Sequence, residues 1–188
     1  MKVVFLSGSI VGSKTKTAIN YAKTKLMDAY PEAEAELLDL AEYDVQFSDG
    51  RHYLDYNGDT KYVTETLMGA DVLVIGTPIF QASLPGTLKN VFDLLPVNAF
   101  RDKVVSMIVT AGSAKHYLIP EQQLKPILAY MKAQIVQTYV FIEEIDFQHK
   151  EIVNDDVLFR MDRLVEDTIV LAETYQNIKK AKEEAYDF

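Results

Sequence analysis

Short apolar runs alternate with stretches of helical periodicity along this chain, and that alternation constrains its fold more than any other feature. Residues 71–76 read Asp-Val-Leu-Val-Ile-Gly, an almost wholly apolar run typical of a strand that is covered on both faces. Ala18, Ala22 and Leu26 recur at every fourth position and predict a helix from about 15 to 30. Strands that alternate with helices in this way predict an α/β protein with a parallel sheet between two helical layers.

Five strands and five helices can be placed along the 188 residues, which we interpret as a single domain, 1–188. A long loop is expected over 41–58 and an irregular segment over 143–156. If the strand order is 2-1-3-4-5, the loops that leave the first, third and fourth strands surround one ligand site. The expected strands are 3–6, 35–40, 71–76, 103–109 and 134–142, and the expected helices are 15–30, 59–68, 86–95, one from about 125, and a long one that closes the chain.

The composition excludes several kinds of chemistry. The chain has no cysteine, which removes disulfides, thiolate catalysis and cysteine-ligated metals, and its three histidines are too far apart to predict a metal site. The net charge of −9 argues against nucleic acid or an anionic membrane as a partner. No segment approaches the roughly 20 apolar residues of a membrane helix, and no targeting segment is recognised, so we expect a cytoplasmic protein.

The loop after the first strand, Gly-Ser-Ile-Val-Gly-Ser-Lys-Thr-Lys-Thr over 8–17, favours a phosphate site. It combines hydroxyls and lysines with the start of a helix, whose N–H groups attract anions. The alternative is an ordinary helix start, capped by Ser13 or Thr15. A nucleotide-triphosphate P-loop is disfavoured because Ser13 stands where its second glycine is needed. No Gly-x-Gly-x-x-Gly occurs either, so a separate NADPH-binding unit is not expected.

The loops after the third and fourth strands favour a flat ligand. Residues 77–86 combine two prolines with Ile79, Phe80 and Leu84, which are too apolar for an ordinary exposed turn. A flat aromatic ligand would account for this stiff, apolar loop. The alternative is that Phe80 and Leu84 pack into the core or a subunit contact. The small residues of 110–114, Thr-Ala-Gly-Ser-Ala, would let the backbone approach the edge of a ring.

Taken together, these loops resemble one known family. The segments concerned are Gly8-Ser9, Ser13 to Thr17, Gly76-Thr77-Pro78-Ile79-Phe80, Leu84-Pro85-Gly86-Thr87-Leu88-Lys89-Asn90 and Thr110-Ala111-Gly112-Ser113. They resemble the NADPH-dependent FMN reductase family, from Met1 to about Phe141, and 77–134 is most similar to the FMN reductases of alkanesulfonate systems. The resemblance implies a flavodoxin-like three-layer sandwich around a five-stranded parallel sheet, with bound FMN.

The resemblance also implies a set of cofactor-binding residues. The FMN phosphate would be bound by Ser9, Ser13, Thr15, Lys16 and Thr17, and the flavin ring would be lined by Pro78, Ile79, Phe80, Gln81, Ala111, Gly112 and Ser113. Thr77 would be a further cofactor-binding residue. Two departures stand out. Many members have an arginine where Val11 stands, so Lys14 or Lys16 would have to supply that charge. The aromatic insertion that some alkanesulfonate enzymes carry near 120–123 is absent.

The implied activity is hydride transfer from NADPH or NADH to FMN, followed by electron release to an acceptor. The cofactor carries this chemistry, so no catalytic side chain is named. The alternatives are a quinone or azo reductase of the same fold, a flavodoxin-type electron carrier that does not oxidise NADPH, and a relative that has lost its flavin. Expected partners are small-molecule substrates and further copies of the chain in a homodimer or homotetramer. A flavin-dependent monooxygenase is a candidate partner.

Overall fold

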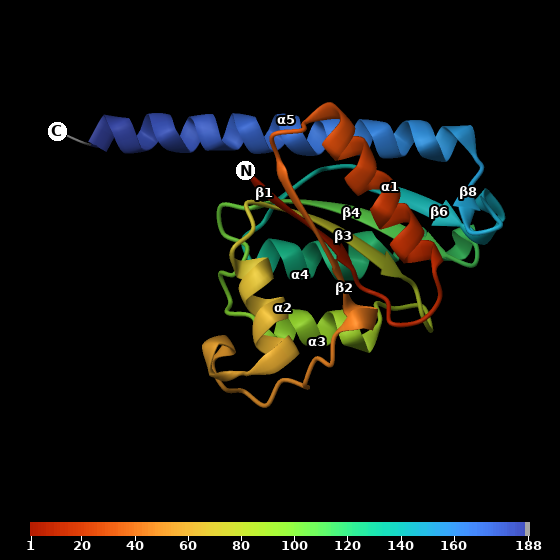
Figure 1. Cartoon of the computed structure of the whole chain (residues 1–188), viewed down its shortest axis with the longest axis horizontal. Helices are drawn as coiled ribbons and strands as arrows, with labels where there is room; N and C mark the ends of the chain where they lie inside the picture. Colours follow the sequence, from red (N-terminus) through yellow and green to blue (C-terminus); the bar gives the residue numbers. More distant parts are fainter. Residues whose placement is uncertain (187–188) are drawn as a thin grey trace.

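A parallel sheet lies at the centre of the computed structural model, which describes residues 1–186. Its strand order is β2-β1-β3-β4-β5, with β6 also paired to β4. Helices α1 and α5 cover one face, and α2, α3 and α4 cover the other (Figure 1). The fold is flavodoxin-like, and the predicted strand order and layering are confirmed.

Short helical turns connect the main elements. 3₁₀ turns occupy Leu40–Glu42, Tyr53–Asp55, Ala114–His116 and Glu144–Asp146, and a π-helical turn occupies Pro120–Leu124. The main elements are β1 (Lys2–Ser7), α1 (Lys14–Ala29), β2 (Glu34–Asp39), α2 (Gly58–Met68), β3 (Val72–Pro78), α3 (Gly86–Leu94), β4 (Val104–Ala111), α4 (Lys125–Tyr130), β5 (Gln134–Ile135), β6 (Val140–Glu143), β7 (Phe147–Gln148), β8 (Glu151–Ile152) and α5 (Asp155–Tyr186).

Strand β3 is buried along its whole length because it pairs with β1 and β4 and has helices on both faces. Its side chains alternate between the two apolar cores. Leu73 and Ile75 join the core beneath α2, α3 and α4, whereas Val72 and Val74 join the core beneath α1 and α5. The apolar run at 71–76 therefore reflects burial on both faces, as the sequence predicts.

The fifth strand is not the single segment predicted over 134–142. It is divided into β5 and β6, which pair with β4 at different points. Between them Gln137 and Thr138 are both exposed. Successive side chains of a strand point to opposite faces, and both faces of this sheet are covered by helices. Two consecutive polar residues therefore leave the sheet, and Lys125 Nζ donates a 2.7 Å hydrogen bond to the freed Gln137 carbonyl oxygen.

The segment 143–156 is more ordered than the sequence predicts. It contains an antiparallel hairpin of β7 and β8. The buried carboxylate of Asp146 fixes the base of this hairpin, because it accepts hydrogen bonds of 2.8 Å from the Glu143 N–H and 2.7 Å from Asn154 Nδ2. Strands of two residues are too short for an alternating pattern, so periodicity could not reveal them.

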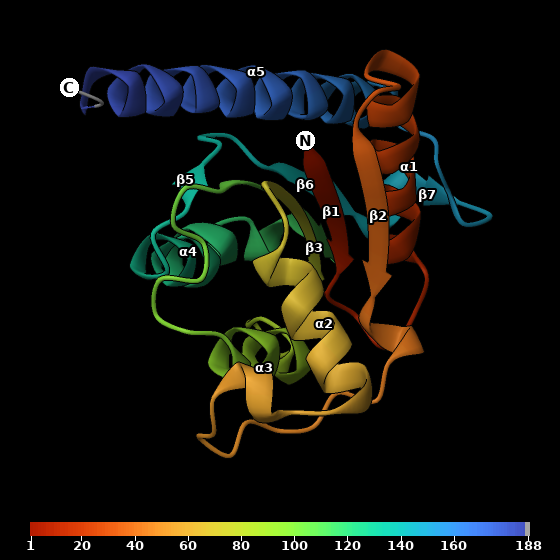
Figure 2. The same ribbon diagram turned by 60° about the vertical axis from the view of Figure 1, so that its left-hand side comes forward.

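Helix α5 extends beyond the body that it covers. Met161, Val165, Ile169 and Ala172 on this helix are buried, but Ile178 further along it is 49% exposed. Figure 2 shows the end of α5 projecting past the sheet. Within 1–186, no helix combines the length and the apolar character needed to cross a membrane.

Helix α1 lies close against the sheet because Gly76 has no side chain. A Cβ at this position would lie 2.4 Å from Cγ1 of the buried Ile19 and 3.1 Å from Cγ2 of Thr15. The N–H of Gly8 donates a 2.8 Å hydrogen bond to the Gly76 carbonyl oxygen. These contacts fix the distance between the first turn of α1 and the end of β3.

We predict that Gly76→Ala lowers the free energy of unfolding by about 1–3 kcal/mol, because the added methyl group must displace Ile19. Urea unfolding of the wild type, Gly76→Ala, Ile19→Val and the double variant measures this effect. The smaller valine makes room for the methyl group, so the double variant should lose less stability than the sum of the two single losses. An unchanged unfolding midpoint for Gly76→Ala would contradict the account.

Candidate functional site

The loops after β1, β3 and β4 meet at the carboxyl edge of the sheet and enclose a cavity of about 310 Å³. Its position is the one expected for a ligand site in this strand order. The lining residues are Val11, Gly12, Ser13, Lys14, Thr15, Pro78, Ile79, Phe80, Thr110, Ala111, Gly112 and Glu144. Seven of the sequence-predicted site residues lie together here, namely Ser13, Thr15, Pro78, Ile79, Phe80, Ala111 and Gly112.

The start of α1 presents backbone N–H groups at this cavity. Ser13 is the N-cap residue, and within the described part of the chain no side chain caps the helix and no acidic residue lies in its first turn. The first N–H groups, including those of Lys14 and Thr15, therefore have no intrahelical acceptor. Gly12 leads into the helix with a φ of 77°, a conformation that glycine adopts without strain. Such a helix start stabilises an anion through its N–H groups and its dipole.

The hydroxyls of Thr15 and Thr110 form a hydrogen bond of 2.8 Å at the back of the cavity. The two residues are only 4% and 5% exposed. This bond ties the first turn of α1 to the end of β4. The Thr15 hydroxyl therefore does not cap α1, which was the alternative considered from the sequence. One hydroxyl donates to the other, which leaves one hydroxyl hydrogen available for a further acceptor.

The loop after β3 is held in one shape by backbone hydrogen bonds. The Ile79 N–H donates to the Thr110 carbonyl oxygen at 3.0 Å, and Phe80 and Ser83 exchange two backbone hydrogen bonds of 3.0 Å. The two residues between Phe80 and Ser83 have positive φ, as a tight turn requires. Phe80 is 40% exposed at the rim of the cavity. The loop thus forms a stiff apolar wall opposite the start of α1.

The side chain of Lys16 is engaged outside the cavity. Its Nζ lies 2.8 Å from Oδ2 of Asp39 and 2.7 Å from Oε1 of Glu42. The two carboxylates raise the pKa of Lys16 above its ordinary value. Asp39 is 2% exposed at the end of β2, so the ion pair ties α1 to that strand. The ammonium group therefore neutralises a buried carboxylate and does not line the cavity.

Two other residues predicted at the phosphate have side chains bonded elsewhere. The Ser9 hydroxyl donates to the Val11 carbonyl oxygen at 2.6 Å, and this bond shapes the loop itself. The Thr17 hydroxyl donates to the Lys150 carbonyl oxygen at 3.2 Å, a contact with the β7–β8 hairpin. Of the other predicted cofactor-binding residues, Thr77 is fully buried, and Gln81 and Ser113 lie outside the cavity lining.

Five lining residues were not among the predicted contacts: Val11, Gly12, Lys14, Thr110 and Glu144. Four of them lie in the loops that the sequence singled out, and Lys14 was considered there as a substitute for the missing arginine. Glu144 follows β6 in a segment that the sequence treated as irregular. Its ion pair with Lys14 is a contact between segments far apart in the chain, for which the sequence holds no local signal.

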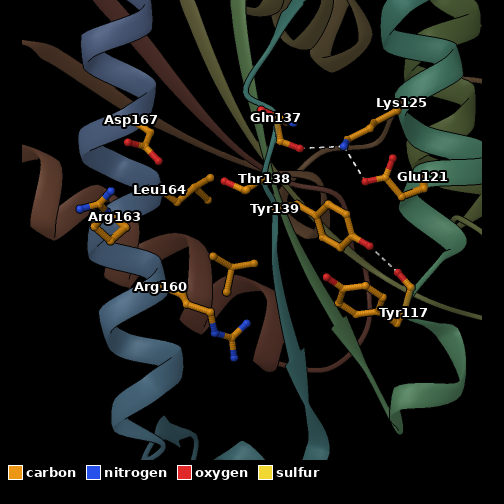
Figure 3. Close-up of a pocket in the computed structure, with 11 residues that line it drawn as sticks. Tyr117, Glu121, Lys125, Gln137, Thr138, Tyr139, Arg160, Arg163, Leu164 and Asp167 are labelled. Carbon is orange, nitrogen blue, oxygen red and sulfur yellow. Dashed lines mark hydrogen bonds and ion pairs between the residues drawn. The ribbon is translucent and has the colours of Figure 1, made fainter.

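A second concavity, of about 650 Å³, lies between α5 and the turn before α4 (Figure 3). Two of the cationic side chains that line it, Lys125 and Arg160, are hydrogen-bonded to the edge of the last strands. Lys125 Nζ donates to the Gln137 carbonyl oxygen at 2.7 Å, and Arg160 Nη1 donates to that of Phe141 at 3.3 Å. Side chains that cover an open edge in this way prevent its pairing with another chain. We interpret this region as a protected sheet edge.

The fold and the carboxyl-edge cavity define a flavodoxin-like protein in which an uncapped helix start lies next to a stiff apolar wall. Residues 1–147 match the family model described as NADPH-dependent FMN reductase, and the chain belongs to that family. It is an oxidoreductase whose cofactors are FMN and NAD(P)H, so the resemblance stated from the sequence is confirmed.

Several known proteins are similar over most of the chain. An NAD(P)H-dependent FAD/FMN reductase of Geobacillus thermodenitrificans is 41% identical over 165 residues, which cover 87% of this chain and 89% of the relative. An FMN-dependent NADPH-azoreductase of Staphylococcus aureus is 30% identical over 185 residues, covering 90% and 94%. The apo crystal structure of an NADH:FMN oxidoreductase (EMOB) superposes with a TM-score of 0.75 and 26% identity, covering 88% and 86%.

The two lysines of the first turn are predicted to have different roles. Lys14→Met should weaken FMN binding about tenfold, because a cation in the cavity is lost, and should leave stability nearly unchanged. Lys16→Met should lower the free energy of unfolding by about 1–2 kcal/mol, since it leaves Asp39 buried without its cation, and should change FMN affinity little. Flavin fluorescence titrations and urea unfolding measure both properties. The reverse pattern would show that Lys16 binds the phosphate.

Proposed function

We propose that FMN binds in the carboxyl-edge cavity and accepts a hydride there from NADPH or NADH. The observation that carries this proposal is the pairing of an uncapped helix start with a stiff apolar wall in one cavity. The first suits the phosphate of FMN and the second suits its ring. When bound, FMN supplies the redox chemistry by taking two electrons as hydride and passing them to an acceptor.

At the phosphate end, the protein's part is to bind and orient. The N–H groups at the start of α1 would donate to phosphate oxygens, with the Ser13 hydroxyl and the Lys14 ammonium beside them. Lys16 and Thr17 would contribute through their positions in the first turn, because their side chains are bonded elsewhere. Ser9 would act by shaping the loop through its bond to the Val11 carbonyl oxygen.

At the ring end, Pro78, Ile79 and Phe80 would pack against one face of the flavin, and the backbone around Gly112 would approach its edge. Gln81 and Ser113 would border this surface from the same two loops. Of the described residues that line the cavity, only Lys14 and Glu144 have titratable side chains, and both belong to its phosphate end. No titratable side chain among these lining residues would therefore lie beside the ring.

We further propose that the protein acts as a homodimer or homotetramer in the cytoplasm and can deliver reduced FMN to a flavin-dependent monooxygenase. A second copy could cover the apolar groove between α3 and α4, which is lined in part by Phe92, Leu95 and Ile127. Val97 and Tyr130 at this groove are 53% and 65% exposed. Light scattering after size-exclusion chromatography tests the oligomeric state.

A second candidate activity is the reduction of azo compounds by FMN that NADPH or NADH has first reduced. The observation that favours it is the 30% identity with the Staphylococcus aureus azoreductase over nearly all of both chains. The two activities share hydride transfer to FMN and differ in the electron acceptor. Assays with free FMN and with an azo dye as acceptor, at the same NADPH concentration, distinguish them.

We predict that the purified protein binds FMN more tightly than riboflavin and oxidises NADPH or NADH only when flavin is present. Binding is measured by flavin fluorescence, and oxidation by the loss of nicotinamide absorbance. Binding of FMN without nicotinamide oxidation would favour a flavodoxin-type electron carrier. Failure to bind any flavin would reject both that alternative and the proposed reductase.

A further inference from the structure

The carboxylate of Glu144 is an unexpected feature of the proposed phosphate site. Glu144 lines the same cavity as Ser13, Lys14 and Thr15, and its Oε1 forms an ion pair with Lys14 Nζ. A binding site for a phosphate dianion ordinarily gathers cations and N–H donors, because like charges repel. In this protein Lys14, the cation nearest the start of α1, is already paired with the carboxylate of Glu144.

The protein holds Glu144 at this position. Immediately before it, the Glu143 N–H donates to the buried carboxylate of Asp146, which Asn154 also contacts at 2.7 Å. The β7–β8 hairpin that follows is tied to α1 by the 3.2 Å hydrogen bond from the Thr17 hydroxyl to the Lys150 carbonyl oxygen. Glu144 therefore belongs to a braced segment that lies against the first turn of α1.

Lys14 contacts this segment at a second point. Its Nζ lies 5.8 Å from the centroid of the Phe147 ring, at the start of the hairpin. The side chain of Lys14 is 37% exposed and that of Glu144 is 66% exposed, so both charges can also reach an incoming ligand. A phosphate that binds at the start of α1 must share Lys14 with Glu144 or displace Glu144 from it.

We propose that Glu144 is a specificity-determining residue, an internal counter-ion that competes with the flavin phosphate for Lys14. This inference rests on the proposed binding of FMN in the cavity. The competition weakens binding of phosphorylated flavins and does not act on riboflavin, which has no phosphate. FMN is thereby released faster than it would be without the Glu144 carboxylate.

Glu144→Gln tests the proposal, with Glu151→Gln as a matched control. Both substitutions remove one negative charge, and the exposed Glu151 lies on β8 of the hairpin that follows Glu144. Affinities for FMN and riboflavin are measured by fluorescence titration at low and high salt. Glu144→Gln should tighten FMN binding about two- to fivefold, in line with an exposed ion pair, and slow FMN release. The gain should shrink at high salt because screening weakens the repulsion.

The outcomes separate this proposal from the proposed function. Riboflavin affinity should stay unchanged in both variants, and Glu151→Gln should resemble the wild type. Unchanged or weaker FMN binding by Glu144→Gln, or an equal gain for riboflavin, would overturn the role of Glu144 and leave FMN binding itself intact. An equal gain in FMN affinity for Glu151→Gln would show a general charge effect and would also overturn the proposed role of Glu144. A wild-type protein that binds no flavin would instead reject the proposed function.

Discussion

The close contact between helix α1 and the end of strand β3 determines the rest of the site. Because Gly76 has no side chain, Ile19 and Thr15 can lie directly against the strand, and the first turn of α1 reaches the carboxyl edge of the sheet. Thr15 then meets Thr110 at the end of β4. Three segments from distant parts of the chain are thereby joined around one cavity, and the apolar cores on both faces of the sheet hold them there.

Charge is distributed around this cavity in a way that the net charge of −9 does not suggest. The sequence places five lysines against one aspartate in residues 1–30, yet the structure assigns these lysines different roles. Lys16 neutralises the buried Asp39 and so stabilises the fold, whereas Lys14 lies at the cavity with Glu144 as its partner. The site we propose for FMN phosphate therefore depends on backbone N–H groups and a shared cation.

The sequence predicted the layered fold because burial on both faces leaves a local signal, such as the continuous apolar run at 71–76. It also identified the three loops, since glycines, prolines and hydroxyls concentrate in them. The sequence could not show in which direction each side chain points or which partner it contacts. Lys16 and Thr17 belong to the expected first turn, but their partners come from β2 and from the β7–β8 hairpin. Glu144 was missed for the same reason. Only the folded chain places the end of β6 beside the start of α1, where Glu144 pairs with Lys14.

The central claim is that the phosphate of FMN lies at the start of α1 and its ring lies against the loop after β3. The most direct measurement follows backbone amide signals by NMR while isotope-labelled protein is titrated with FMN and, separately, with riboflavin. The account predicts that both flavins shift the amides of Ile79, Phe80 and Gly112, and that only FMN shifts those of Lys14 and Thr15. Identical shifts from both flavins at the start of α1, or none there with FMN, would contradict it.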